Sequence, residues 1–439
     1  MDNNSVLNFL YDKVLEGFTQ ARDISPDELA WPLKLLLILL GYSTVALPCF
    51  VFIYYVRQRY TGREGKEPNS LLGQLAKAFA IGHPEYLLAQ PLVNETSPKK
   101  KEESSNARRH LWNDLLALAF FFMGIQSTLV MMGFFQERII TQGYPSSTDP
   151  LIMDKFGDAQ FLVFCNRIIA LVIVFVVLGY NWSRQPPHVP PFYQHAWTSF
   201  SNTISSWCQY EALKYVSFPT QTICKASKVV ATMVMGTIVR GQRYSCAEYL
   251  CGAFIAAGAS VFLLASSSAG IGETTTTVSG MILMFGYLVF DAFTLNWQKK
   301  LFDVKPKVSK YQMMFGVNVF SAVLCAVSLA EQGTLFTSME FATTHRGFIR
   351  DVFLLSLSGA TGQLFIYSTI ERFGPIVFSV IMTIRQMLSI LLSSFYYGHP
   401  MSAWAFVGFF LVFGAMFSDI YRRYSRQQIA PAKGGKHQG

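Results

Sequence analysis

Apolar runs alternate with short polar segments along most of this chain. The pattern predicts a first membrane-spanning helix at 33–56, because an apolar run of about 20 residues is long enough to cross a bilayer. Ten further spans form the body of the protein. They are expected at 113–135, 159–180, 196–214, 219–239, 246–265, 278–297, 311–331, 348–370, 375–397 and 401–421.

The polar segments divide the chain further. Residues 1–32 form an N-terminal segment, 57–112 a linker and 422–439 a basic tail. Within the linker, Leu71–Ala80 is expected to be a short amphipathic helix on the membrane. Lys and Arg gather in alternate gaps between the apolar runs, so the positive-inside rule places the N-terminal segment in the lumen. The same rule places the linker and the C-terminus in the cytosol.

Composition agrees with a membrane protein. The chain is 51% hydrophobic and only 14% charged, whereas soluble domains carry about 25% charged residues. The net charge of +9 would otherwise suggest a nucleic-acid partner. Because the cations fall in loops, we expect no nucleic acid and take the lipid bilayer as the partner. The cysteines are dispersed without a CxxC pair, so we expect neither a disulfide framework nor a metal site.

A weak internal repeat links Trp207–Gly241 to Thr361–Gly398. A shift of 157 positions places Lys228 on Arg385. Each stretch has a helix with amides and a tyrosine, a turn near proline, and a second apolar helix interrupted by a cation. Ordered internal symmetry of this kind is typical of transporters built from repeats.

Five spans in each half make the two repeats inverted, because an odd number of spans returns the chain to the opposite side. We therefore expect an all-α polytopic membrane protein with a first five-helix repeat at 113–265 and a second at 278–421. An extra N-terminal transmembrane helix precedes them. This geometry suits a site that opens to each side in turn.

Three cations inside the apolar runs are the most informative residues. Lys225 and Lys228 are three apart, which on one helix places them on one face, and the repeat adds Arg385. Each costs about 2.5–3.5 kcal/mol to insert into a bilayer. We favour binding of a polyanion, because Arg offers a fork for phosphate or sulfate oxygens and Lys a mobile point charge. The alternative is neutralisation of buried acids. The available acids are Glu211, Asp291 and Glu371.

Other polar residues are candidates to line the same site. Amides read base edges and tyrosines stack on bases, although hydrogen bonding between helices explains such residues equally well. The candidates of this kind are Gln209, Tyr210, Gln363 and Tyr367. Asn318 and Gln386 are added as cavity-lining candidates. Arg167 is either a further phosphate contact or a cation near a helix end.

Enzyme signatures do not occur in the sequence, which has no GxGxxG, Walker lysine loop, HExxH or GxSxG motif. We therefore expect neither an enzyme nor a cofactor. Transport would then be driven by substrate gradients rather than by ATP hydrolysis. Two alternatives from other classes are a polytopic membrane transferase and a non-transporting scaffold.

Five motifs resemble the nucleotide-sugar transporter family of the drug/metabolite transporter superfamily, and within it the members that carry adenosine 3′-phospho 5′-phosphosulfate (PAPS). The motifs are SSWCQYEALKYVSFPTQ (Ser205–Gln221), KASKV (Lys225–Val229), FDAFTLNWQ (Phe290–Gln298), YQMMFGVN (Tyr311–Asn318) and GQLFIYSTIERFGPIVFSVIMTIRQ (Gly362–Gln386). The resemblance covers the ten-span body and the extra helix.

The resemblance implies ten body helices in two inverted repeats, within a multi-pass protein of the Golgi membrane. It also implies import of PAPS into the lumen, where it supplies sulfotransferases, in exchange for an adenosine phosphate such as 3′,5′-ADP. The nearest alternative is a UDP-sugar antiporter of the same fold, since a UDP-sugar also carries a diphosphate and a base. We also consider a homodimer.

Overall fold

The computed structural model describes residues 26–61, 70–82, 104–145, 153–212, 214–216, 218–266, 277–345, 347–397 and 402–429. Some predicted features lie outside these residues. They are residues 1–25 of the N-terminal segment, 62–69 and 83–103 of the linker, 430–439 of the tail, and Gly398.

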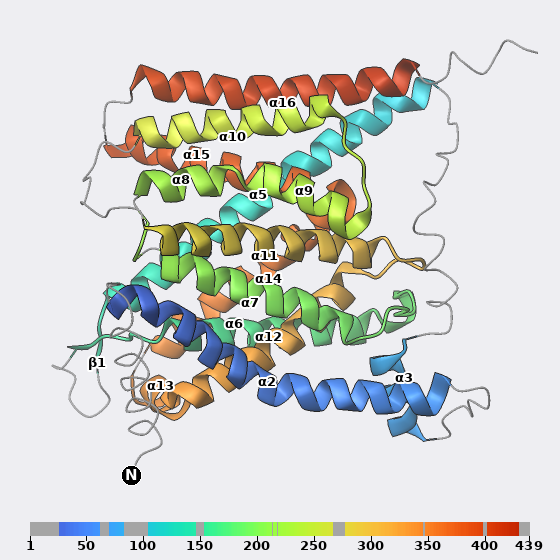
Figure 1. Ribbon diagram of the computed structural model, residues 1–439, viewed down its shortest axis with the longest axis vertical. Coiled ribbons are helices and arrows are strands. Elements are labelled where there is room, and N and C mark those ends of the chain that lie inside the picture. The colour runs from blue at the N-terminus through green and yellow to red at the C-terminus, as the bar shows by residue number, and fades with distance from the viewer. Residues whose placement is uncertain are drawn as a thin grey trace, which may run out of the picture. The chain divides into compact units, whose positions relative to one another are not determined.

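The described chain is almost entirely helical (Figure 1). Its α-helices are α2 (Pro26–Thr61), α3 (Leu71–Ala80), α5 (Ser104–Thr141), α6 (Ala159–Tyr180), α7 (Gln194–Ala212), α8 (Phe218–Ala226), α9 (Lys228–Arg240), α10 (Cys246–Ser266), α11 (Val278–Phe302), α12 (Lys310–Gln332), α13 (Thr334–Thr344), α14 (Phe348–Phe373), α15 (Pro375–Tyr397) and α16 (Ala403–Ile429). A 3-10 turn η2 (Trp182–Arg184) follows α6. The strands β1 (Tyr144–Pro145) and β2 (Met153–Asp154) pair antiparallel, with Tyr144 opposite Asp154.

Eight of the described helices are long and apolar enough to cross a membrane, and the bent pair α8–α9 raises the number to nine if it is one span. This confirms an all-helical polytopic protein. Each range predicted for a span contains helix, and α6 has the predicted ends. However, α7 does not reach the hydropathy of a span, and the apolar part of α16, Ala403–Ser418, is short for one. The short helix α13 was not expected.

Polar side chains define where several helices begin and end. The Asp158 carboxylate accepts hydrogen bonds from the backbone N–H groups of Gln160 and Phe161, both at 3.0 Å, and so starts α6. Before α10, the Glu248 carboxylate accepts from the Ser245 N–H at 2.7 Å, which is half of a capping box. Helix α9 ends at Arg240, and the following Gly241 has a φ of 64°, a conformation that favours glycine.

The chain folds into two compact units, and helices α5, α7, α12 and α14 contribute residues to both. The first unit comprises residues 1–88, 129–196 and 314–361. In this unit, the C-terminal end of α3 is held against the segment before α7. The Arg57 Nε donates to the Ala80 carbonyl at 3.2 Å, and its Nη2 donates to the Tyr193 hydroxyl at 2.9 Å. The predicted helix at Leu71–Ala80 is confirmed, and its place on the membrane stays a prediction.

A second polar cluster in the first unit lies beside β1. The Asp351 carboxylate accepts from the Tyr144 hydroxyl at 3.0 Å and pairs with the Arg138 Nε at 3.2 Å. Burial, together with this carboxylate, raises the pKa of Tyr144 above its ordinary value. The aromatic rings of Phe156 and Phe348 pack beside this cluster with centroids 4.7 Å apart.

The second unit comprises residues 89–128, 197–313 and 362–439. Helix α10 packs along α16, as Figure 1 shows, and also contacts α8, α9 and α15. The backbones of α10 and α16 approach closely at two glycines. A Cβ placed on Gly408 would lie 2.5 Å from the Gly258 carbonyl oxygen and 2.5 Å from the Phe262 nitrogen. Small residues permit this approach, as they do in many membrane helix pairs.

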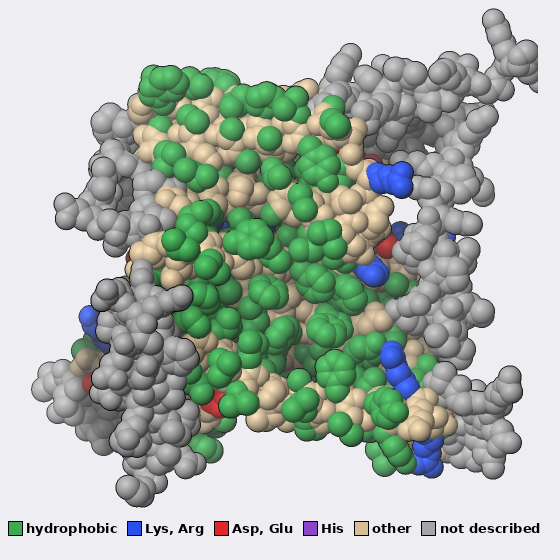
Figure 2. Space-filling model, in the orientation of Figure 1, with side chains coloured by type: hydrophobic (Ala, Val, Ile, Leu, Met, Phe, Trp, Pro, Cys, Tyr) green, Lys and Arg blue, Asp and Glu red, His purple; other side chains and the backbone are tan. Residues whose placement is uncertain are grey.

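Large apolar side chains stand exposed along the helices of both units. Phe175 of α6 and Phe410 of α16 are each 69% exposed. Hydrophobic side chains cover much of the face seen in Figure 2. Exposed apolar surface of this extent marks a contact with membrane, in agreement with the apolar runs of the sequence.

Candidate functional site

The helix predicted at 219–239 is broken at Ser227. Helix α8 ends at Ala226 and α9 begins at Lys228, and the two axes differ by 46°. The prediction of one continuous helix is therefore wrong, and Lys225 and Lys228 lie on either side of the break. The Ser227 hydroxyl donates to the Cys224 carbonyl at 2.7 Å, a side-chain bond that competes with regular helix geometry.

The break places a new helix N-terminus inside the span. The first N–H groups of a helix have no partner within it and carry partial positive charge. In transporters, such half-helix N-termini point at anionic groups of the substrate. Lys228 is the first residue of α9, so an ammonium and a helix N-terminus lie together.

Lys228 forms an ion pair with Asp291 of α11. The Lys228 Nζ lies 2.7 Å from the Asp291 Oδ2, and the two side chains are 13% and 18% exposed. Asp291 is one of the three acids that the sequence offered as partners for the buried cations. A second, Glu211, pairs instead with Lys214, at 2.8 Å.

Arg385 of α15 lies near enough to Lys228 to repel its ammonium. Within the described residues, neither Arg385 nor Lys225 forms an ion pair, and the Arg385 Nε is buried without a hydrogen-bond acceptor. In this region of the second unit, Asp291 therefore neutralises Lys228 and leaves the charge of Arg385 without a carboxylate partner in the described part of the chain. An arrangement with excess positive charge favours an anionic ligand.

Polar bonds fix the helices that carry these charges. The Asn296 amide donates to the Thr232 carbonyl at 2.9 Å and thereby joins α11 to α9. The Thr232 and Ser379 hydroxyls lie 3.1 Å apart and join α9 to α15. The sequence analysis did not single out Thr232 or Ser379. Their signal was a polar residue inside an apolar run that also carries a cation, Lys228 for Thr232 and Arg385 for Ser379.

The amides and tyrosines predicted near the cations differ in exposure. Gln209 and Gln363 are half-buried, as is Gln386, which follows Arg385 on α15. Tyr367 is 5% exposed on α14, whereas Tyr210, its counterpart in the repeat, is 66% exposed on α7. Equivalent positions in the repeat thus have different surroundings.

Arg167 and Asn318 lie together in the first unit. The Arg167 Nη1 donates to the Asn318 Oδ1 at 3.4 Å, and the Asn318 amide also donates to the Met314 carbonyl at 2.8 Å. Asn318 is fully buried. The two residues are therefore partners of each other, and their contact with a substrate stays a prediction.

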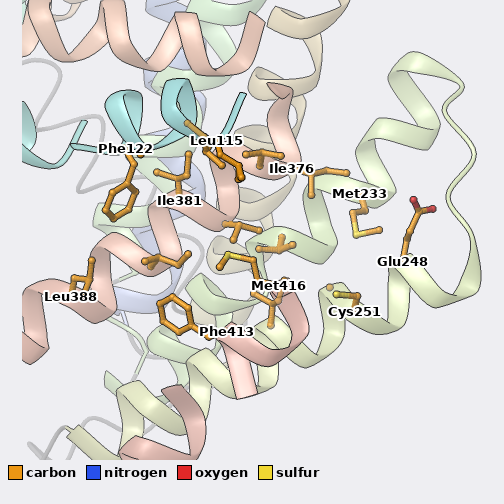
Figure 3. A pocket seen from close by; sticks show the side chains of 18 residues that line it. Leu115, Phe122, Met233, Glu248, Cys251, Ile376, Ile381, Leu388, Phe413 and Met416 are labelled. Atoms are coloured by element: carbon orange, nitrogen blue, oxygen red, sulfur yellow. The ribbon is translucent and has the colours of Figure 1, made fainter. Parts of the chain in front are cut away.

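A cavity of about 420 Å³ lies in the second unit between α5, α9, α10, α15 and α16. Figure 3 shows apolar side chains around it, among them Phe122, Met233, Ile381 and Phe413. None of the predicted site residues lines it. Apolar walls cannot replace the hydration of phosphate or sulfate, and the acid Glu248 also lines the cavity, so it does not suit an anionic ligand.

The model of the UAA transporter family matches residues 117–423. A relative from Caenorhabditis elegans named adenosine 3′-phospho 5′-phosphosulfate transporter 1 is 63% identical, covering 94% of this chain and 97% of its own length. The human protein of that name is 40% identical over 87% of this chain and 85% of its own. The UDP-galactose/UDP-glucose transporter 5 of Arabidopsis thaliana is 35% identical over 76% of this chain and 92% of its own.

Proposed function

Because the chain belongs to the UAA transporter family, we propose that it carries PAPS from the cytosol into the Golgi lumen. The counter-substrate in this proposal is a lumenal adenosine phosphate such as 3′,5′-ADP. The protein is a multi-pass membrane transporter and not an enzyme, which removes the membrane transferase from consideration. The observation that carries the proposal is 63% identity, over 94% of the chain, to a relative named for PAPS transport.

The chemistry of the second unit supports this substrate. PAPS carries a phosphosulfate at one end of its ribose and a phosphate at another, so it presents several negative charges beside one purine. Lys225, Lys228 and Arg385 offer three positive charges against the single carboxylate of Asp291. We propose that Lys228 and Arg385 bind the anionic groups, with Lys225 adding to the field. In this proposal, the half-buried amides and Tyr367 contact the base.

We also propose the finer architecture that the sequence suggested. In this proposal, residues 113–265 and 278–421 form two inverted five-helix repeats, preceded by an extra helix at 33–56. Their support is the repeat that places Lys228 on Arg385 and the alternation of basic loops. The proposed orientation has the C-terminus in the cytosol, and the Golgi location is proposed from the resemblance to PAPS transporters.

A UDP-sugar is the second candidate substrate. The Arabidopsis UDP-galactose/UDP-glucose transporter 5 is 35% identical over 76% of the chain, and a UDP-sugar also joins a base to a diphosphate. It carries fewer anionic groups than PAPS, so it makes less use of the excess positive charge.

Uptake by the purified full chain in proteoliposomes tests the proposal. Vesicles loaded with 3′,5′-ADP should accumulate radiolabelled PAPS faster than unloaded vesicles. Unlabelled PAPS should compete with the label, and UDP-galactose should compete much less. Uptake of UDP-galactose in preference to PAPS would refute the substrate, whereas equal uptake by loaded and unloaded vesicles would refute the exchange.

A further inference from the structure

The ion pair between Lys228 and Asp291 lies where the proposed function needs a free cation. The Asp291 carboxylate holds the Lys228 Nζ at 2.7 Å, which is the distance of a strong charge-assisted hydrogen bond. A phosphate or sulfate oxygen bound to Lys228 would approach from a similar distance. Asp291 therefore presents to Lys228 the same kind of oxygen that an anionic substrate presents.

We propose that Asp291 competes with the substrate anion for Lys228, so that binding of the substrate displaces the carboxylate and its departure lets the pair form again. This inference rests on the proposed function, in that it assumes an anionic nucleotide as the cargo. It assigns Asp291 a role in setting substrate affinity and release. The alternative is a static pair that only neutralises a buried lysine.

Electrostatics favours competition over a static pair. A phosphate bound to Lys228 would lie within a few ångströms of the Asp291 carboxylate, and two anions at that distance repel each other strongly where water is scarce. The remaining cations add to the attraction for the substrate, since Arg385 and Lys225 form no ion pair within the described chain. A polyanion can engage several of these cations at once, which a single carboxylate cannot do.

The geometry also allows the exchange of partners. Both side chains retain some exposure, 13% for Lys228 and 18% for Asp291, so the pair is not sealed within a core. The helices themselves are held by other bonds, namely Asn296 to the Thr232 carbonyl and Thr232 to Ser379. The ammonium and the carboxylate can therefore separate while α9, α11 and α15 stay joined.

The competition between Asp291 and the substrate also assists release of the substrate. An unpaired lysine inside a bilayer is costly, and breaking a buried pair leaves an uncompensated charge. Re-formation of the pair with Asp291 offsets this cost and so assists release. Removal of the carboxylate should accordingly strengthen substrate binding and slow turnover, a combination that a loss of a binding contact does not produce.

The Asp291→Asn variant in proteoliposomes tests the inference. We expect the KM for PAPS uptake to fall about tenfold, within the range usual for coupled sites, and the maximal rate to fall as well. The matched control is Asp303→Asn, because Asp303 caps the same helix and pairs with Lys299 at 2.8 Å and Arg240 at 3.6 Å. Asp303→Asn should leave the KM within about twofold of the parental value. An Asp291→Asn variant with an unchanged or raised KM would overturn the inference.

A second variant covers the case in which Asp291→Asn fails to fold. The double exchange Lys228→Asp with Asp291→Lys keeps an ion pair between the same two helices. A static pair predicts that this exchange retains uptake, which would overturn the inference. Competition for a correctly placed ammonium predicts that the exchange folds but loses at least about tenfold in uptake, because the cation now lies on α11.

The outcomes separate this inference from the proposed substrate. If the parental protein takes up UDP-galactose rather than PAPS, the proposed substrate fails, and the same KM comparison is made with UDP-galactose. If the parental protein takes up PAPS and Asp291→Asn has the parental KM, the substrate stands and only the competition fails.

Discussion

Replacing Arg385 by glutamine separates the binding role of this cation from a structural one. Within the described residues Arg385 has no ion pair, and its Nε is buried without an acceptor. Its loss therefore leaves no carboxylate unpaired. A charge-assisted hydrogen bond contributes about 1.5–3 kcal/mol. If Arg385 makes one such bond to the substrate, its removal lowers uptake efficiency by roughly tenfold to a hundredfold.

The thermal stability of the Arg385→Gln variant should rise or stay constant while its PAPS uptake falls. Insertion of an arginine at the centre of a membrane helix costs about 2.5–3.5 kcal/mol on insertion scales, and the Arg385→Gln variant avoids this cost. We therefore expect its Tm in detergent to equal or exceed that of the parental protein, while PAPS uptake falls. The two measurements together define the prediction.

The assay is the initial rate of PAPS uptake against concentration, with Tm measured on the same purified samples. Arg372→Gln is the matched control, because Arg372 pairs with Asp114 at 2.7 Å on the exposed surface, where such a pair contributes about 0–1 kcal/mol. Parental uptake by Arg385→Gln would refute the assigned role. A large fall in Tm would instead show that Arg385 is structural.

Three other predictions concern the Lys228 ion pair, a buried histidine and the contact between α10 and α16. Lys228→Gln should abolish most uptake and also lower Tm, because it leaves the Asp291 carboxylate unpaired at a cost of about 3–5 kcal/mol; an unchanged Tm would contradict the ion pair. Burial lowers the pKa of His188 to about 4, below its ordinary value of 6.5. As the pH falls from 6.5 towards 4, the unfolded chain takes up a proton at this histidine and the folded protein does not, so the folded protein should lose stability. Thermal unfolding across this range checks that result, and His188→Asn should show a weaker pH dependence. Gly408→Leu should lower the Tm in detergent strongly, because a side chain at this position meets the α10 backbone. The control Gly414→Leu should have little effect on this Tm, because a Cβ at Gly414 meets nothing within 4 Å.

The sequence predicted the helices best where an apolar run is bounded by clear end signals. Helix α6 has the predicted ends because Asp158 caps its first turn and the run that follows is continuous. Helix α7 was also predicted, although its Ser, Thr and Asn residues leave it below the hydropathy of a span. The break at Ser227 was not predicted, because the sequence there has neither proline nor glycine, the usual causes of a sharp bend.

The candidate site was predicted only as a set of residue types. Nothing in the sequence distinguished Glu211, Asp291 and Glu371 as partners for the buried cations. The fold distinguishes them, because Glu211 pairs with the nearby Lys214 and Asp291 alone lies across from Lys228. Glu371 contacts a lysine through its backbone, since its backbone carbonyl accepts a hydrogen bond from the Lys299 Nζ at 2.8 Å. Which helices face each other decides such pairings, and a single sequence does not contain that information.

The close glycine contact between α10 and α16 has a practical consequence for following conformational change. Since the Gly258 and Gly408 backbones leave no room for a side chain between them, the two helices cannot slide past each other without first moving apart. We therefore expect α16 and α10 to move together as one rigid body. A spin label or fluorophore on the outer surface of α16 would then report the displacement of α10 without any alteration near the charged residues.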